Sequence, residues 1–205
     1  MAPRQDVSEQ RRHQIMDAAT AVFARMGFER TRMDDIADEA GVSKGALYLY
    51  FKSKDAIIAT LLKFFFDQAL KQIRTLATGE GSVVTQLQTL TRHLTREMDR
   101  MASLRPVSLQ FYAIAARQSS VRQHLRAYFA EYRVVMEELI RRGIAQGELR
   151  PTINPTEVAI TLTGLYEGLA LLWMIDPQAT NWHAQAEAAT QLLLVGLVTN
   201  RDATP

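Results

Sequence analysis

Hydroxyl and ammonium groups that can bind phosphate are concentrated between residues 43 and 54 of this 205-residue chain. They belong to Ser43, Lys44, Tyr48, Tyr50 and Lys54, and residues 40–54 contain three lysines and no acidic residue. Proteins contact the phosphates of a nucleic-acid duplex with side chains of these types. The alternative is an exposed helical hairpin whose tyrosines only cover the edge of a core.

Two short helices around a glycine turn would position these side chains. The sequence pattern predicts helices over 33–40 and 43–51, with Ser43 at the N-cap of the second. This is the spacing of a helix-turn-helix. Gly45 and Ala46 leave the start of the second helix without bulky side chains, so it can approach a DNA groove closely. A duplex therefore suits this segment better than a small substrate does.

Helical periodicity continues through the rest of the chain, and we expect an all-α fold of about nine helices. We find no alternating pattern that predicts a strand. Caps and glycine or proline stops divide the chain into helices over 8–26, 33–40, 43–51, 54–78, 82–102, 106 onward, 119–146, 155–175 and 181–199. Ser8, Ser53, Asn154 and Asn181 are the expected capping residues of four of them.

Composition excludes several classes of protein. There is no cysteine, so disulfide frameworks, thiol nucleophiles and cysteine-ligated metals are excluded. The four histidines lack metal-ligand spacing, and we expect no metal and no cofactor. We find no nucleophile–base pair, phosphate loop or paired carboxylates, so an enzyme is not favoured. We expect residues 56–66 to be the most membrane-like stretch, but they are too short to span a membrane, and we expect no signal peptide.

The net charge of +2 conceals an uneven distribution. Residues 88–150 carry 11 basic and 6 acidic groups, a balance of +5, whereas residues 151–205 carry −4. The basic segment suggests an anionic or acyl-type ligand, but a solvated arginine face explains it better. Residues 1–54 carry only +1, so the case for DNA binding depends on where the lysines lie.

Residues 18–57, which read AATAVFARMGFERTRMDDIADEAGVSKGALYLYFKSKDAI, resemble the DNA-binding domain of the TetR family of transcriptional regulators. The resemblance implies a dimer whose first three helices bind DNA and whose remaining helices bind a small effector and the partner subunit. On this basis we expect a helix-turn-helix domain over residues 9–69 and an effector-binding and dimerisation domain over residues 70–205. Beyond residue 60 the resemblance is one of architecture only.

The resemblance also implies which residues contact DNA. The family's phosphate-binding threonine matches Thr31, and the neighbouring Arg32 offers a further contact. Leu49 departs from the polar or aromatic residue found in many relatives, so it offers an apolar contact only, and DNA shape would contribute more to specificity. The expected DNA-binding residues are Thr31, Arg32, Ser43, Lys44, Gly45, Ala46, Tyr48, Leu49, Tyr50 and Lys54.

Aromatic and thioether side chains on the later helices are expected to line a hydrophobic effector pocket. Each of them is also a normal core residue, and His93, which could hydrogen-bond an effector, could equally be a histidine at the edge of the core. The expected pocket residues are Phe65, His93, Leu94, Met98, Phe111, Tyr112, Tyr128, Tyr132, Met136, Tyr166 and Trp173.

The last two predicted helices carry more apolar residues than surface helices normally do, and pairing with a second copy would cover them. The expected dimer-interface residues are Leu162, Leu165, Leu169, Leu172, Leu193 and Leu197. The sequence thus predicts a cytoplasmic, homodimeric repressor that binds a palindromic double-stranded DNA operator and is released by a small, largely hydrophobic effector of unknown identity. The alternative is a helical ligand sensor or adaptor that does not bind DNA.

Overall fold

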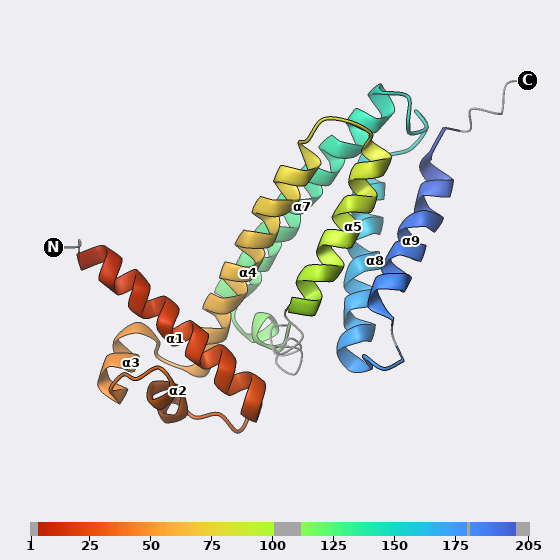
Figure 1. The fold of residues 1–205 in the computed structure, drawn as a ribbon. Helices are drawn as coiled ribbons and strands as arrows, with labels where there is room; N and C mark the ends of the chain where they lie inside the picture. Colours follow the sequence, from red (N-terminus) through yellow and green to blue (C-terminus); the bar gives the residue numbers. More distant parts are fainter. Residues whose placement is uncertain (1–3, 101–111, 180, 200–205) are drawn as a thin grey trace, which may run out of the picture. The chain divides into compact units, whose positions relative to one another are not determined.

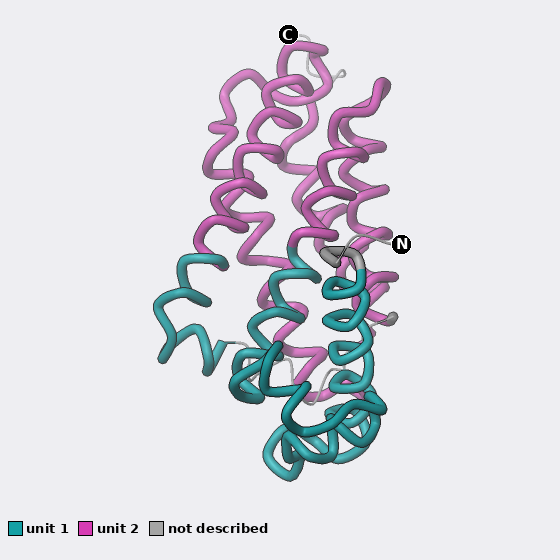
Figure 2. The backbone as a smooth tube through the Cα atoms, turned by 90° about the vertical axis from the view of Figure 1, so that its left-hand side faces the viewer, with its two compact units in different colours: residues 1–66, 101–124 teal, residues 67–100, 125–205 magenta. Residues whose placement is uncertain are grey.

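The structure, a computed structural model, describes residues 4–100, 112–179 and 181–199. The described residues are helical apart from turns and one isolated β-bridge, so the all-α prediction is confirmed. The chain divides into two compact units (Figure 2). Unit 1 comprises residues 1–66 and 101–124, and unit 2 comprises residues 67–100 and 125–205.

Unit 1 begins with the long helix α1 (Arg4–Met26), which packs on the short helix α2 (Met33–Glu39) (Figure 1). Helix α2 in turn packs on α3 (Lys44–Tyr50). Gly41 turns the chain between α2 and α3 with a φ of 61°, a left-handed conformation that glycine adopts without strain. Phe23, Ile36 and Leu47 are fully buried, so each of the three helices contributes to the core of this unit.

Helix α4 (Lys54–Ala77) is one continuous helix whose first residues belong to unit 1 and whose later residues belong to unit 2. Unit 2 adds α5 (Val83–Arg100), α7 (Ser119–Ala145), α8 (Pro155–Ile175) and α9 (Trp182–Leu197). Within this unit α5 and α8 both pack against α9 (Figure 1). Its core is formed by aliphatic side chains from all five helices, with Tyr132 and Met136 of α7 among them.

Most helix boundaries follow the predicted caps. The Ser43, Asn154 and Asn181 side chains accept hydrogen bonds from the backbone amides of Ala46, Thr156 and Ala184 respectively. The predicted cap at Ser8 is wrong, because α1 already begins at Arg4 and Ser8 lies inside it. Residues 112–117 are also helical, while the predicted start of that helix at residue 106 lies outside the described residues.

Glu148, in the loop between α7 and α8, holds the start of α5. Its carboxylate accepts hydrogen bonds from the Ser82 hydroxyl (2.7 Å) and from the backbone amides of Val83 and Val84 (3.1 and 3.2 Å). Partial burial alone would raise the pKa of this carboxyl, but these hydrogen bonds and the nearby Arg142 lower it. The charged form of Glu148 therefore stabilises the N-terminus of α5.

Helix α8 is long and apolar enough to cross a membrane by length and composition alone, although only 22% of its most apolar window is buried within the chain. It therefore replaces residues 56–66 as the most membrane-like segment of the described chain. Its buried residues, including Val158 and Leu162, face the core of unit 2. Other apolar residues of α8, including Ile160, Leu171 and Leu172, are exposed in the part of the chain that the structure describes.

Candidate nucleic-acid interface and core cavity

Helix α3 is anchored by its apolar residues and presents the rest of its surface to solvent. Leu47 within the helix and Phe51 just after it are buried. Ser43 caps the helix, accepting a hydrogen bond from the backbone amide of Ala46 over 3.1 Å. Gly45 is exposed, and the Leu49 side chain is 79% exposed. This short helix therefore offers small residues, an apolar tip and polar groups to a partner.

The two tyrosines of α3 lie at the edge of this surface. Tyr48 and Tyr50 are both half-buried. Arg12 of α1 donates a hydrogen bond to the backbone carbonyl of Tyr50 over 3.4 Å, and its guanidinium lies 5.0 Å from the centre of the Phe51 ring. Arg12 is not among the residues expected at this surface, because nothing in its local sequence indicates a partner 38 residues away.

Lys44, at the start of α3, forms an ion pair with Asp34 at the start of α2. The Lys44 Nζ atom lies 2.9 Å from the Asp34 carboxylate, and both side chains are more than half exposed. The hydrogen bond that Lys44 donates to Asp34, together with the negative charge of Asp34, raises the pKa of Lys44. Lys44 is therefore a fully charged ammonium group held at the surface by an exchangeable partner.

Thr31 and Arg32 differ sharply in exposure. Thr31 is 1% exposed, and its hydroxyl donates a hydrogen bond to the Gly27 carbonyl over 2.7 Å. Its side chain thus closes the turn after α1 and does not present a hydroxyl to solvent. Arg32 is exposed at the N-cap position of α2, where its backbone amide donates to the Asp35 carboxylate over 2.7 Å. Of the two, only Arg32 exposes its side chain to solvent.

Lys54 also has a local role. Its ammonium donates to the backbone carbonyls of Phe28 and Glu29 (2.6 and 3.3 Å) and lies 4.5 Å from the centre of the Phe28 ring. Lys54 therefore fixes the start of α4 to the turn that precedes α2. Lys52, which is exposed and donates to the Tyr48 carbonyl over 2.7 Å, is a further cation beside α3.

Three of the eight acidic side chains of residues 1–54 have a local partner. Asp34 binds Lys44, Asp35 accepts from the amide of Arg32, and Glu39 forms a 2.7 Å ion pair with Arg25. Paired in this way, these carboxylates repel a nearby phosphate less than isolated ones would. Among the described residues, no group of three or more His, Asp or Glu side chains is arranged to hold a metal ion.

Unit 2 contains a small cavity of about 10 Å³, which is no more than the space one water molecule needs. Helices α4, α5, α7 and α8 all contribute to its wall. The lining residues are Ile73, Leu87, Leu90, Leu94, Tyr132, Met136, Leu162 and Tyr166. Four of the predicted pocket residues, Leu94, Tyr132, Met136 and Tyr166, thus share one cavity wall. None of the lining side chains is charged.

The other predicted pocket residues lie elsewhere. Tyr128 stacks at an angle between Phe129 and Tyr132, and Trp173 is buried with its ring centre 6.5 Å from that of Trp182. The remaining four described residues do not line the cavity: His93 and Met98 on α5 of unit 2, and Phe65 and Tyr112 in unit 1. Phe111 lies outside the described residues.

Three hydroxyl groups lie within hydrogen-bond distance of one another beside the cavity. Only one of them, that of Tyr166, belongs to an expected pocket residue. The Tyr166 hydroxyl lies 2.5 Å from Thr91 Oγ1 and 2.7 Å from Thr190 Oγ1, and the two threonine oxygens are 2.9 Å apart. Thr91 and Thr190 are buried. We call these three groups the hydroxyl triad. Thr91 and Thr190 lie on the apolar faces of α5 and α9. The position of a polar residue on an apolar helix face is the only sequence signal that could have indicated their role.

The predicted dimer residues divide into two groups. Leu162 and Leu197 are only 3% and 8% exposed because they belong to the chain's own core. Leu172 is 55% exposed, and Leu165, Leu169 and Leu193 are half-buried. Five further apolar residues of α8 and α9 are exposed: Ile160, Leu171, Ile175, Leu192 and Val195.

Family models match both parts of the chain. Residues 15–61 match the model of the bacterial regulatory proteins of the tetR family. Residues 85–198, more than half of the chain, match the model of the C-terminal domain of BetI-type transcriptional repressors. The first match contains α2 and α3, and the second contains most of the cavity-lining residues.

Individual proteins are similar over most of their length. The HTH-type transcriptional regulator YfiR of Bacillus subtilis is 29% identical over 174 residues, covering 82% of this chain and 83% of the relative. The structure of SmeT, the repressor of the Stenotrophomonas maltophilia multidrug efflux pump SmeDEF, has a TM-score of 0.74 at 25% identity and covers 95% and 93% of the two chains. FadR of Bacillus subtilis, in complex with stearoyl-CoA, shares the fold with a TM-score of 0.74 at 24% identity, covering 90% and 98%.

Proposed function

Because the chain belongs to the TetR family of bacterial transcriptional regulators, we propose that it is a repressor released from a palindromic operator by a small, largely hydrophobic effector. In this proposal it binds the operator as a homodimer in the cytoplasm. Membership of this family supports DNA binding and transcriptional regulation as the general activity. The observation that supports operator binding is the surface of α3. The helix is anchored by one buried leucine, and it exposes Lys44, Gly45 and Leu49 beside its N-cap Ser43.

The proposed DNA contacts follow from the exposure of each side chain. Lys44, Arg32 and the hydroxyl of Ser43 bind phosphate, and Leu49 contacts a base edge such as a thymine methyl group. Gly45 and Ala46 allow close approach of the helix to the major groove. Tyr48 and Tyr50 contribute their hydroxyl groups at the edge of the surface. In this refined proposal Thr31 and Lys54 support the interface from within, since both are engaged with backbone carbonyls.

The proposed dimer interface is the exposed apolar surface of α8 and α9. Leu172 of α8 and Leu192 and Val195 of α9 are 55%, 76% and 70% exposed. A second copy of the same two helices would cover these side chains and would explain why a helix as apolar as α8 is so little buried. A two-fold dimer would also present two α3 helices to half-sites about one DNA turn, roughly 34 Å, apart.

Helix α4 provides the proposed link between effector and operator. It is one continuous helix that begins in unit 1 and contributes Ile73 to the cavity in unit 2. The cavity is too small for an effector as it stands, so binding must displace lining side chains, Ile73 among them. An effector that binds only the displaced arrangement would shift the population away from the DNA-binding state.

A charge placed on α3 tests the DNA-binding part of this proposal. At Gly45 no heavy atom lies within 4 Å of where a Cβ would be, so a side chain fits without disturbing the fold. Gly45→Glu should abolish operator binding because its carboxylate would face phosphate, whereas the melting temperature and dimer mass should not change. Gly45→Gln is the matched control of similar size and should retain more affinity than Gly45→Glu. Equal affinity of the two variants for operator DNA would contradict the proposed orientation of α3.

The sensor or adaptor that does not bind DNA is the second candidate function. Its support is the nearly neutral charge of residues 1–54. It predicts that neither Gly45 variant differs from wild type in any DNA-binding assay, and that no sequence is enriched from random DNA. The Gly45 pair therefore distinguishes the two candidates directly.

A further inference from the structure

The hydroxyl triad contains fewer hydrogens than its contacts require. Besides the three mutual contacts, Thr91 Oγ1 lies 3.0 Å from the Leu87 carbonyl and Thr190 Oγ1 lies 2.8 Å from the Ala186 carbonyl. A carbonyl oxygen can only accept, so each of these two contacts uses a threonine hydrogen. One hydrogen, that of Tyr166, then remains for the three contacts among the hydroxyl oxygens.

This deficit gives the triad a definite chemical character. Each hydroxyl carries one hydrogen and two lone pairs, so the cluster has more acceptor capacity than donor capacity. A buried acceptor without a donor costs free energy that an incoming O–H or N–H group would recover. The triad therefore favours a ligand that donates a hydrogen bond over one that only accepts.

Among the described residues, those that line the cavity beside the triad include no cation that could hold an anion. Tyr166 lines the cavity together with aliphatic side chains of α4, α5 and α8, and none of the basic residues between 88 and 150 is among the lining residues. Burial raises the pKa of Tyr166, so its hydroxyl stays neutral. Burial also raises the pKa of the neighbouring Tyr132, so its hydroxyl is neutral as well.

We infer that the effector of this cavity is an uncharged molecule with an apolar body and an O–H or N–H group that donates to the hydroxyl triad. This inference rests on the proposed function, namely that unit 2 binds an effector. It excludes fatty-acid anions and other carboxylates as ligands of this site, because a carboxylate would bring a negative charge and only acceptors to an acceptor-rich cluster. The +5 balance of residues 88–150 then belongs to solvent-facing arginines.

Three matched probes test this chemistry: 1-nonanol, which donates and accepts; 1-methoxyoctane, which has the same atoms but only accepts; and nonanoate, which is anionic. Binding is measured by calorimetry on the full-length protein without DNA. We expect 1-nonanol to bind about tenfold more tightly than 1-methoxyoctane, the gain of about one satisfied hydrogen bond. We expect nonanoate not to bind at this site.

Variants of the triad separate ligand selection from packing. Thr91→Val with Thr190→Val removes the two acceptors with little change of volume and leaves the Tyr166 hydrogen without a partner. The preference should then disappear or reverse in favour of the ether. Thr75→Val with Thr163→Val is the matched control, because these hydroxyls bind only backbone carbonyls of their own helices. It should keep the tenfold preference.

Tyr166→Phe provides a second readout if the double variant does not fold. It removes the hydrogen that the two threonine oxygens share, so the preference for the alcohol should persist or widen. A purely structural triad would instead change the melting temperature of all these variants and leave the ratio of the two dissociation constants unchanged. That result would overturn the inference, as would equal affinity of alcohol and ether, tighter binding of nonanoate, or no saturable binding of any probe.

Fluorescence anisotropy on operator DNA keeps this inference distinct from the proposed function. If 1-nonanol binds with the expected dependence on the triad but operator affinity does not change, effector-controlled release is wrong and the ligand chemistry stands. If nonanoate releases the operator and 1-nonanol does not, the ligand chemistry is wrong and effector-controlled release stands.

Discussion

Lys44 offers a quantitative test of the DNA interface, because its contribution can be measured as a salt dependence. In the free protein its ammonium is held 2.9 Å from the Asp34 carboxylate, with both side chains exposed. Phosphate can therefore replace Asp34 without breaking a buried contact. Each lysine that neutralises one phosphate adds about 0.9 to the slope of log affinity against log salt. Lys44→Ala should therefore reduce this slope by roughly 1.8 for a dimer.

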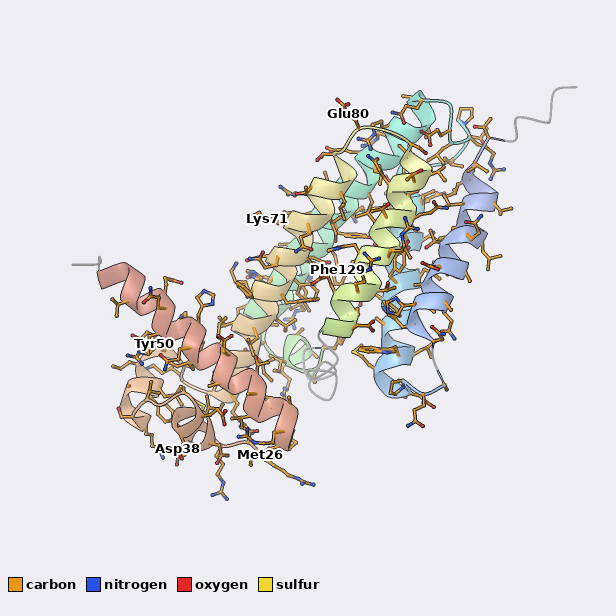
Figure 3. All side chains as sticks on the ribbon, in the orientation of Figure 1. Met26, Asp38, Tyr50, Lys71, Glu80 and Phe129 are labelled. Atoms are coloured by element: carbon orange, nitrogen blue, oxygen red, sulfur yellow. The ribbon has the colours of Figure 1, made fainter. Side chains whose placement is uncertain are left out.

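The assay is fluorescence anisotropy with a selected operator between 50 and 200 mM salt. Between these two salt concentrations, the variant should lose operator affinity by a factor roughly 12-fold smaller than the wild type does, because its slope is smaller by 1.8. Asp34→Asn should raise operator affinity, because it frees Lys44 and removes a negative charge from the interface. The control is Lys71→Ala on α4 in unit 2, where the lysine is exposed (Figure 3). An unchanged slope for Lys44→Ala, with a folded dimer, would refute the proposed phosphate contact.

Three further predictions concern stability and assembly. Gly143→Ala should lower the free energy of unfolding by about 1–3 kcal/mol in urea denaturation, because its Cβ would lie 2.7 Å from a methyl carbon of buried Leu149. The Glu148 carboxyl has a lowered pKa in the folded state, so its stabilisation is present above the unfolded pKa and is lost as pH falls through the folded pKa. Wild type should therefore lose stability faster than Glu148→Gln below about pH 4.5. Leu192→Glu combined with Val195→Glu should convert the dimer to a monomer in sedimentation experiments.

Each of these predictions has a clear opposing result. A Gly143→Ala variant as stable as wild type would mean that Leu149 moves aside at no cost. Parallel pH–stability curves for wild type and Glu148→Gln would show that the carboxylate contributes nothing as an anion. A fully dimeric charge variant of α9 would place the dimer interface elsewhere on the chain.

The helices were predictable because their signals are local. Ser43, Asn154 and Asn181 cap helices through bonds to amides two or three residues away, so the sequence contains both partners. Ser8 shows the limit of the same reasoning, since a good capping residue does not prevent a helix from starting earlier at Arg4. The helix-turn-helix was equally local, with one glycine turn between two short helices.

The roles of side chains were harder to predict, because they depend on contacts distant in sequence. Lys54 was expected to contact DNA, and its ammonium also binds carbonyls about 25 residues away, which its local sequence did not indicate. Leu162 and Leu197 share the pattern of the exposed leucines, yet they pack into the chain's own core. Periodicity assigns a residue to a face of a helix, but it does not say which neighbour covers that face.

The hydroxyl triad was missed for the same physical reason. Thr91 and Thr190 are 99 residues apart and lie on different helices, and each alone is an ordinary threonine on an apolar face. Only the packing of α5, α8 and α9 brings them to Tyr166. Only some of the aromatic residues expected in a pocket line the cavity wall. The sequence could not separate them from the others, because large apolar side chains are equally suited to a core and to a pocket.

Selection of bound DNA from a random library, using the full-length protein, tests the central claim most directly. The proposed function predicts enrichment of a two-fold symmetric sequence whose half-sites are centred about one helical turn apart. The same selection with Gly45→Glu should enrich nothing. Failure of the wild-type protein to enrich any sequence, or equal enrichment by the Gly45→Glu variant, would contradict the claim that α3 reads an operator.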